Sequence, residues 1–169
     1  TGYGIVERRS GRLIHVAHGV VRPRAGDALA SRLDQLYGTV TDVIASFGPD
    51  CAVVEEVIVA SSPRSALVLG QARGAILAAV ARAGVPGNEY TPARIKKSVT
   101  GNGRASKLQV QKMVRRLLSL ERVPASDAAD ALAAAISHAN AGRLAALGKT
   151  AGSRGARGQA AAFTARRTR

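Results

Sequence analysis

The 169-residue chain is strongly basic, with 25 Lys and Arg residues against 11 Asp and Glu and a formal net charge of +14. Its length suits one domain with a single core. Apolar residues make up 46% of the chain and aromatic residues only 3%, which favours a small-residue α/β interior over a β-sandwich. One cysteine excludes an internal disulfide. No apolar run is long enough to span a membrane, so we expect a soluble, intracellular protein.

The basic residues concentrate in two segments that contain no acid. Residues 90–120 hold eight Lys and Arg and residues 143–169 hold seven, so fifteen of the 25 lie in these two segments. A field of this kind attracts polyanions and steers them. Nucleic acid is therefore the predicted partner. A membrane surface fits less well, because no predicted helix sets Trp or Phe opposite a basic face.

The sequence alternates between strand-like and helix-like segments. Short apolar or alternating runs bounded by turn residues predict strands at residues 1–7, 13–21, 51–54 and 88–91. Apolar residues recurring every three or four positions, with capping residues, predict helices at residues 27–47, 62–84, 92–99, 106–118 and 126–140. This order predicts an α/β domain over residues 1–140 with partly parallel strand pairing. Residues 141–169 are rich in Gly, Ala, Arg and Ser, which favours a basic disordered tail.

Two carboxylates open the alanine-rich helix predicted from Ser126. Asp127 and Asp130 are three residues apart, so both project from one face of the first turns. One interpretation is capping, because acids in a first turn interact with the positive end of the helix dipole. The other is a divalent-metal site. In a cleft of low dielectric the two carboxylates repel by more than the dipole offsets, and a cation or a proton is then required.

A second acidic pair, Glu55-Glu56, directly follows the buried strand predicted at 51–54. In α/β sheets, ligands gather at the carboxyl ends of strands. Alternation sends the two side chains to opposite faces, and spacing alone does not decide which one points inward. Together with Asp127 and Asp130, in a chain otherwise short of acids, a strand-end carboxylate indicates a hard-cation site suited to phosphodiester hydrolysis.

The other polar candidates carry weaker signals. His15, His18 and His138 form no ligand pair at helical spacing, and we interpret them as structural. The segment Gly101-Asn102-Gly103 could cradle a phosphate between basic neighbours, but a plain turn between helices is the simpler interpretation.

Four blocks of sequence occur in the order and spacing of one known family. They are Thr1-Gly2-Tyr3-Gly4, Glu55-Glu56-Val57 with residues 65–74, Val99 to Gly103 with Lys107 and residues 109–111, and residues 127–133. Over about residues 1–140 the chain resembles RuvC-type Holliday-junction resolvases, and the tail 141–169 is not covered.

The resemblance implies a ribonuclease H-like mixed sheet flanked by helices. It implies a homodimeric, cytoplasmic enzyme without membrane association. The enzyme would resolve four-way DNA junctions by paired nicking, leaving 5′-phosphate and 3′-hydroxyl ends. The implied cofactor is Mg²⁺, two ions per subunit with Mn²⁺ able to substitute. The implied partners besides junction DNA are the branch-migration proteins RuvA and RuvB.

The resemblance also assigns individual residues. Glu55, the first of its pair, is implied to act with Asp127 and Asp130 as catalytic metal ligand. The DNA-binding candidates are Lys96, Lys107, Ile58, Arg64 and Arg104. The implied dimer helix carries Gly70 and Gly74. At Ile58 the family often has an aromatic that inserts at the junction centre, and isoleucine stacks poorly, so we expect weaker junction distortion.

One departure concerns the family's fourth carboxylate, an aspartate on the first, central strand just upstream of the block that matches Thr1 to Gly4. This sequence starts after it. We therefore expect the central strand to be absent, the chain to be unstable and poorly active, and a truncated sequence to be the explanation. The alternative is a catalytically impaired or inactive protein that still binds DNA junctions. A basic RNA-binding module is a third hypothesis, and it predicts no preference for branched DNA over duplex.

Overall fold

The computed structural model describes residues 1–56, 62–148 and 158–164, and within these ranges the chain forms five strands and five helices. The strands are β1 (Gly2–Arg9), β2 (Arg12–Val20), β3 (Cys51–Glu55), β4 (Gly87–Tyr90) and β5 (Gly158–Thr164). The helices are α1 (Leu29–Phe47), α2 (Pro63–Arg82), α3 (Pro92–Thr100), α4 (Lys107–Leu117) and α5 (Ser126–Gly148). Each element predicted within residues 1–140 is present, with bounds that shift by no more than two residues apart from the end of α5.

Local capping explains where several helices begin and end. Ser62 accepts a hydrogen bond from the backbone N–H of Ser65, and Pro63 fills the first helical position of α2, where no N–H partner is needed. Ser106 and Gln109 form the predicted capping box of α4, which satisfies two backbone N–H groups. Gly48 ends α1 with φ at 53°, a left-handed conformation that glycine adopts without strain.

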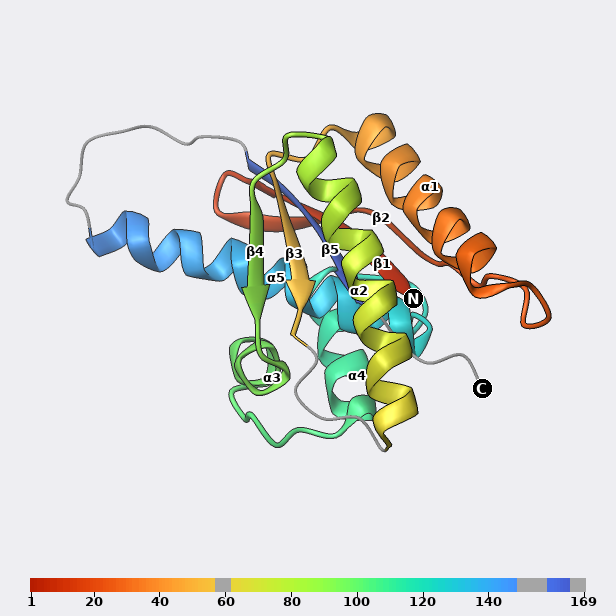
Figure 1. Ribbon diagram of the computed structural model, residues 1–169. Helices are drawn as coiled ribbons and strands as arrows, with labels where there is room; N and C mark the ends of the chain where they lie inside the picture. The colour runs from red at the N-terminus through yellow and green to blue at the C-terminus, as the bar shows by residue number, and fades with distance from the viewer. Residues whose placement is uncertain (57–61, 149–157, 165–169) are drawn as a thin grey trace.

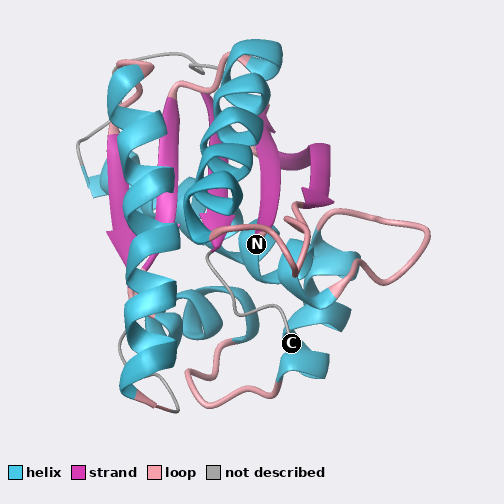
Figure 2. Ribbon diagram, turned by 45° about the vertical axis from the view of Figure 1, so that its right-hand side comes forward, coloured by secondary structure: helices cyan, strands magenta, loops and turns pink. Residues whose placement is uncertain are grey.

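The strands form one mixed sheet in the order β2-β1-β5-β3-β4. β1 pairs antiparallel with β2 and with β5, whereas β3 pairs parallel with β4 and with β5. Figure 1 shows α1 and α2 against one face of this sheet and α5 against the other, and Figure 2 shows the sheet between these helical layers. The predicted α/β class with partly parallel pairing is confirmed.

The C-terminal part of the chain differs from the sequence prediction. The predicted disordered tail begins at residue 141, yet α5 continues to Gly148, and residues 158–164 form β5 in the middle of the sheet. In the described part of the chain, β5 thus occupies the central position of the sheet. The segment from Gly158 to Thr164 contains no charged residue, so it can be buried between β1 and β3 at no desolvation cost for a charge. Residues 149–157 and 165–169 lie outside the described part.

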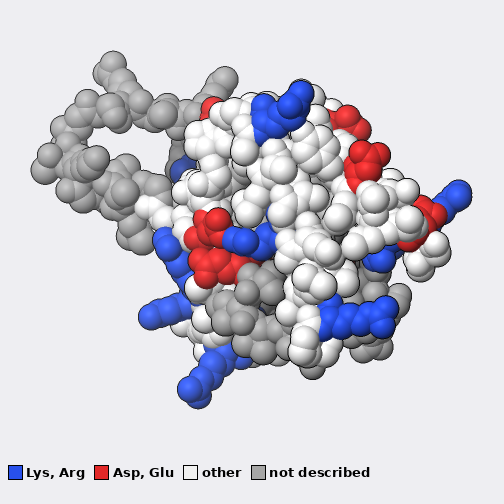
Figure 3. Space-filling model, viewed as in Figure 1, with Lys and Arg blue, Asp and Glu red and all other residues white. Residues whose placement is uncertain are grey.

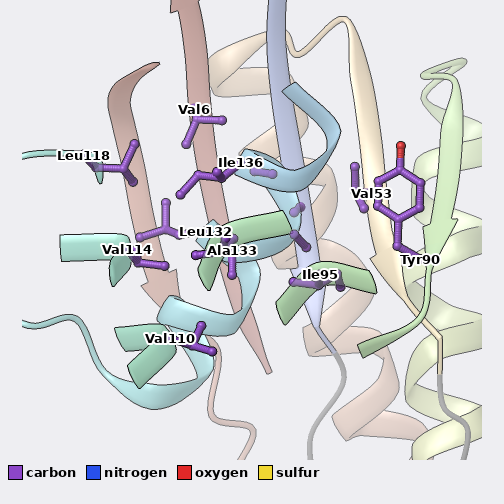
Figure 4. Close-up of a cluster of buried hydrophobic side chains, with 14 of the residues drawn as sticks. Val6, Val53, Tyr90, Ile95, Val110, Val114, Leu118, Leu132, Ala133 and Ile136 are labelled. Atoms are coloured by element: carbon purple, nitrogen blue, oxygen red, sulfur yellow. The ribbon is translucent and has the colours of Figure 1, made fainter. Parts of the chain in front are cut away.

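Two apolar cores lie on opposite faces of the sheet. Alternation along the strands sends Ile5, Val54 and Phe163 to the core under α1 and α2. The neighbouring residues Val6 and Val53 point to the core under α3, α4 and α5. Both belong to one cluster with Leu132, in which Figure 4 shows Val53 beside Tyr90. Among the described residues, no helix combines the length and the apolar character needed to cross a bilayer.

Candidate active site

A cavity of about 150 Å³ brings together side chains from four elements. Glu55 is the last residue of β3, Lys96 lies on α3, Lys107 is the first residue of α4, and Asp130 lies on α5. The remaining lining residues are Pro92, Ile95, Val110 and Ala133. Two acidic and two basic residues thus line one cavity at the carboxyl end of a parallel strand, where α/β folds gather ligands.

The alternation of β3 selects between the two adjacent glutamates. Val53 packs in the core under α5, so Glu55, two residues further along the strand, points to the same side. Glu56 follows the strand, and its backbone N–H donates to the carbonyl oxygen of Tyr90 at 3.0 Å. Spacing in the sequence does not decide between Glu55 and Glu56. In the structure it is Glu55 that lines the cavity.

The two aspartates of α5 have different surroundings. Asp130 lines the cavity with Glu55. Asp127 lies in the first turn of α5, and its Oδ2 is 3.5 Å from the amino group of Thr1. Within residues 1–56, 62–148 and 158–164, no group of three or more His, Cys, Asp and Glu side chains is arranged to hold a metal ion. The structure thus joins two of the three predicted ligands in one cavity, and the role of Asp127 stays a prediction.

Close backbone approaches position the first turns of α5. A Cβ added at Gly2 would lie 1.9 Å from the carbonyl oxygen of Asp127, and one added at Gly4 would lie 2.7 Å from the backbone nitrogen of Leu132. Such distances leave room only for glycine on β1. The hydroxyl of Thr164 on β5 donates to the carbonyl oxygen of Asp127 at 3.4 Å. The helix that carries both aspartates is therefore seated directly on the backbones of β1 and β5.

A polar cluster of Tyr90, Arg94 and His138 is not predicted by the sequence analysis. The hydroxyl of Tyr90 lies 2.8 Å from Nδ1 of His138, and the guanidinium carbon of Arg94 lies 3.9 Å from the centre of the Tyr90 ring. Burial lowers the pKa of His138, and the positive charge of Arg94 lowers it further. Tyr90 and His138 are 48 residues apart, so no local pattern could reveal the pair. His138 is satisfied by this contact, in agreement with its interpretation as structural.

Two further predicted DNA contacts, Arg64 and Arg104, are not among the residues that line the carboxylate cavity. Arg64 lines a separate cavity of about 210 Å³ between α1 and α2. Arg104 is exposed and follows a turn in which its backbone N–H donates to Asn102 Oδ1 at 2.9 Å. The hydroxyl of Thr100 also hydrogen-bonds within this turn, which supports the simple-turn interpretation of residues 101–103. Ile58 lies outside the described residues.

The surface around α3 is marked by positive charge. In the view of Figure 3, Lys and Arg side chains project from the end of the molecule that carries α3. On α2, a Cβ added at Gly70 or Gly74 would meet no atom within 4 Å. This side of α2 is therefore open within the described part of the chain.

The mixed sheet carries Glu55 at the end of β3, and Asp130 on α5 lines the same cavity. This arrangement is typical of the ribonuclease H-like class. The family profile described as "Crossover junction endodeoxyribonuclease RuvC" matches residues 1–138. The chain is 47% identical to the RuvC of Cupriavidus metallidurans over 152 residues, covering 90% of this chain and 83% of the relative. It is 43% identical to the RuvC of a Geobacter species over 147 residues, covering 87% and 90%.

Solved structures agree with the sequence relatives. "T. thermophilus RuvC in complex with Holliday junction substrate" matches with a TM-score of 0.80 and 33% identity, covering 85% of this chain and 88% of that one. The chain therefore belongs to the RuvC family of crossover junction endodeoxyribonucleases. This is a family of metal-dependent enzymes that cut DNA in recombination and repair. The profile match ends before β5, so the strand at the centre of the sheet comes from outside the matched region.

Proposed function

We propose that this chain resolves four-way DNA junctions by Mg²⁺-dependent phosphodiester hydrolysis, with Glu55 and Asp130 as its central carboxylates. The observation that carries this proposal is the convergence of Glu55 and Asp130 with Lys96 and Lys107 in one cavity. The two acidic residues come from the end of β3 and the start of α5, and the two lysines come from α3 and α4. A structural ion pair would need only one residue of each kind.

The donor set fits a hard divalent cation. Mg²⁺ is usually held in proteins through one or two carboxylates, with waters and substrate phosphate completing its shell. Glu55 and Asp130 provide such a pair, and Asp127 is the proposed third ligand. Two Mg²⁺ ions per subunit, replaceable by Mn²⁺, are proposed from the family resemblance. When bound, such ions stabilise negative charge on the phosphate and lower the pKa of water.

The lysines have a separate role in the proposed reaction. Two ammonium groups offset the charge of two carboxylates, so a phosphodiester entering the cavity does not meet uncompensated negative charge. Lys96 on α3 and Lys107 at the start of α4 line the cavity beside the carboxylates, and they would hold the DNA backbone phosphate there. Arg64, Arg104 and Ile58 are proposed as contacts further along the DNA.

The proposed assembly and location follow from the substrate. A junction that is nicked twice needs two active sites, and we propose a homodimer whose contact includes the open side of α2 at Gly70 and Gly74. RuvA and RuvB are the proposed partners in junction processing. The proposed location is the cytoplasm, where chromosomal DNA is found in bacteria.

The carboxylates can be tested by conservative substitution. We expect Asp130→Asn and Glu55→Gln each to slow nicking of a labelled four-way junction by at least about a hundredfold, since even residues that only support metal ligands cost 10- to 100-fold when changed. Gel-shift binding of the junction should persist, because removing a negative charge eases phosphate approach. Asp42→Asn, at an exposed position on α1, is the matched control. Nicking by Asp130→Asn at the rate of the parent would refute the proposal.

The alternative function, a junction-binding protein with impaired catalysis, can be tested at Thr164. Val54 pairs with Phe163 in the parallel ladder, so Glu55 and Thr164 are the next residues on adjacent strands. Ala162 and Val53 face α5, and Glu55 and Thr164 therefore face it too. We expect Thr164→Asp to place a further carboxylate beside Glu55 and to raise Mg²⁺-dependent nicking by at least about tenfold. Thr164→Asn is the control, and equal rates for both variants would contradict this expectation.

A further inference from the structure

Two histidines that are not linked by their sequence spacing lie in contact on strand β2. Nε2 of His15 is 2.7 Å from Nδ1 of His18, and their rings are inclined at 61° with centroids 4.8 Å apart. The rings therefore meet through ring nitrogens rather than face to face. Neither residue is among those that line the carboxylate cavity, so the pair has no part in the proposed nuclease reaction.

An irregularity in β2 places both rings on one side of the sheet. In a regular strand, residues three apart point to opposite faces. Here the pairing with β1 skips from Ala17 to His15, so Val16 is an extra residue. Such a bulge re-aims the side chains beside it. Val16 and Ala17 both pack against the core under α1 and α2, and His15 and His18 are both left on the α5 side.

The partner residues on β1 confirm this placement, because residues paired across two strands project to the same face. His15 pairs with Val6, which packs in the core with Leu132 of α5. His18 pairs with Gly4, where an added Cβ would also meet Leu132. His15 is half-buried and His18 is exposed. One ring is therefore held by its surroundings, and the other has room to turn.

The contact between the rings prepares them to act as ligands. A hydrogen bond between two ring nitrogens needs one donor and one acceptor, so at least one of the two imidazoles is neutral. Neutral imidazole suits zinc, copper and nickel ions, whereas Mg²⁺ prefers oxygen. When an ion takes the place of the shared proton, the donor ring changes tautomer and its proton moves to its other nitrogen. Both lone pairs can then turn to the ion.

The distance between the nitrogens favours particular ions. Two nitrogens 2.7 Å apart, each bonded to an ion at about 2.0–2.1 Å as in zinc–imidazole bonds, subtend an angle of about 80–85°. This is close to the right angle of square-planar or tetragonal coordination, which is typical of Cu²⁺ and Ni²⁺. A tetrahedral zinc site, with angles of about 109°, would require the nitrogens to move apart. Within residues 1–56, 62–148 and 158–164 no third His, Cys, Asp or Glu joins the pair, so water would complete the shell.

We propose that His15 and His18 form a two-histidine site for Cu²⁺ or Ni²⁺ on β2, separate from the Mg²⁺ site proposed at the carboxylates. The two rings act as a chelate, because an ion bound by one ring meets the second at a high effective concentration. The inference does not rest on nuclease activity, and its test needs no DNA.

The test measures Ni²⁺ binding to the untagged full-length chain by titration calorimetry. Ni²⁺ is the probe because Cu²⁺ would also oxidise the thiol of Cys51, and excess Mg²⁺ is present to occupy oxygen-ligand sites. We expect one Ni²⁺ per chain. His15→Gln and His18→Gln should each weaken binding by at least about tenfold, because a single remaining imidazole no longer chelates. His138→Gln is the matched control, since this third histidine is engaged with Tyr90, and it should bind Ni²⁺ as the parent does.

A second measurement locates the ion in the parent protein and does not depend on the folding of any variant. Histidines are labelled with diethyl pyrocarbonate with and without Ni²⁺, and the labelled positions are read by mass spectrometry. Ni²⁺ should protect His15 and His18 and leave the labelling of His138 unchanged. The proposal is overturned if both glutamine variants of the pair bind Ni²⁺ as tightly as the parent, or if Ni²⁺ does not protect the pair from labelling.

Discussion

The two faces of the sheet are packed in different ways, although the same strands supply both. Under α1 and α2 the contacts are made by branched and aromatic side chains such as Ile5, Ile76 and Phe163. Where α5 crosses β1 and β5, alanines of the helix meet glycine and alanine of the strands, and the backbones approach each other closely. The face under α1 and α2 is packed through large side chains, whereas the α5 side combines large residues such as Leu132 and Ile136 with direct backbone approach at Gly2 and Gly4.

The difference corresponds to what each face does. Asp127 and Asp130 sit on the helix that lies on the small-residue face, so the position of their backbone is fixed by contacts that tolerate almost no displacement. The proposed catalytic role of these two aspartates would need placement to within a fraction of an ångström, and backbone contact provides it better than long side chains with several rotamers. The face under α1 and α2 carries none of the proposed site residues Glu55, Asp127 and Asp130, so its packing can contribute stability without having to fix their positions.

The largest effect is expected at Phe163, which anchors β5 in the core under α1 and α2. Phe163→Ala should lower the free energy of unfolding by about 3–5 kcal/mol, because it leaves a cavity in a fully buried position. Urea denaturation measures this directly. Phe47→Ala, at the half-buried end of α1, is the control and should cost less. A loss of less than about 1 kcal/mol at Phe163 would mean that side-chain volume does not hold this face.

An intermediate effect is expected from adding one methyl group to each face. Gly4→Ala places a Cβ 2.7 Å from the Leu132 backbone nitrogen, and we expect it to destabilise the fold by about 1–3 kcal/mol through overpacking. Gly38→Ala on α1 meets no atom within 4 Å and should stabilise the helix by about 0.5–1 kcal/mol. Thermal unfolding of the two variants should therefore shift in opposite directions. Shifts of the same sign would remove the contrast between the faces.

The smallest effect concerns pH and His138, on the α5 side. Burial and the charge of Arg94 lower its pKa in the folded state below the usual 6.5. The unfolded chain then binds the proton more readily, so stability is fully present above about pH 6.5 and declines as the pH falls below it. His138→Gln should flatten the decline measured by urea denaturation between about pH 7.5 and 5. An unchanged slope would assign the decline to other groups, such as His15, whose pKa is also lowered by burial.

Much of the local structure could be predicted because its causes are local. The capping box at Ser106 and Gln109 and the apolar stripe of α1 were both visible as spacing along the chain, and both elements form where predicted. The candidate site was predictable in part. Glu55, Asp130, Lys96 and Lys107 could each be named from the sequence, but their meeting in one cavity depends on how four elements pack together.

The sequence by itself determined the class of fold, the positions of the helices and most strands, and the excess of positive charge, since periodicity, capping and composition act over a few residues or over the chain as a whole. Residue spacing left Glu55 and Glu56 open, the family resemblance favoured Glu55, and the tertiary structure places Glu55 in one cavity with Asp130. Only the tertiary structure decided that Tyr90 hydrogen-bonds to His138 and that an alanine-rich segment becomes the central strand. These outcomes join residues far apart in the chain. They depend on pairing partners and close approach, which local propensity does not encode.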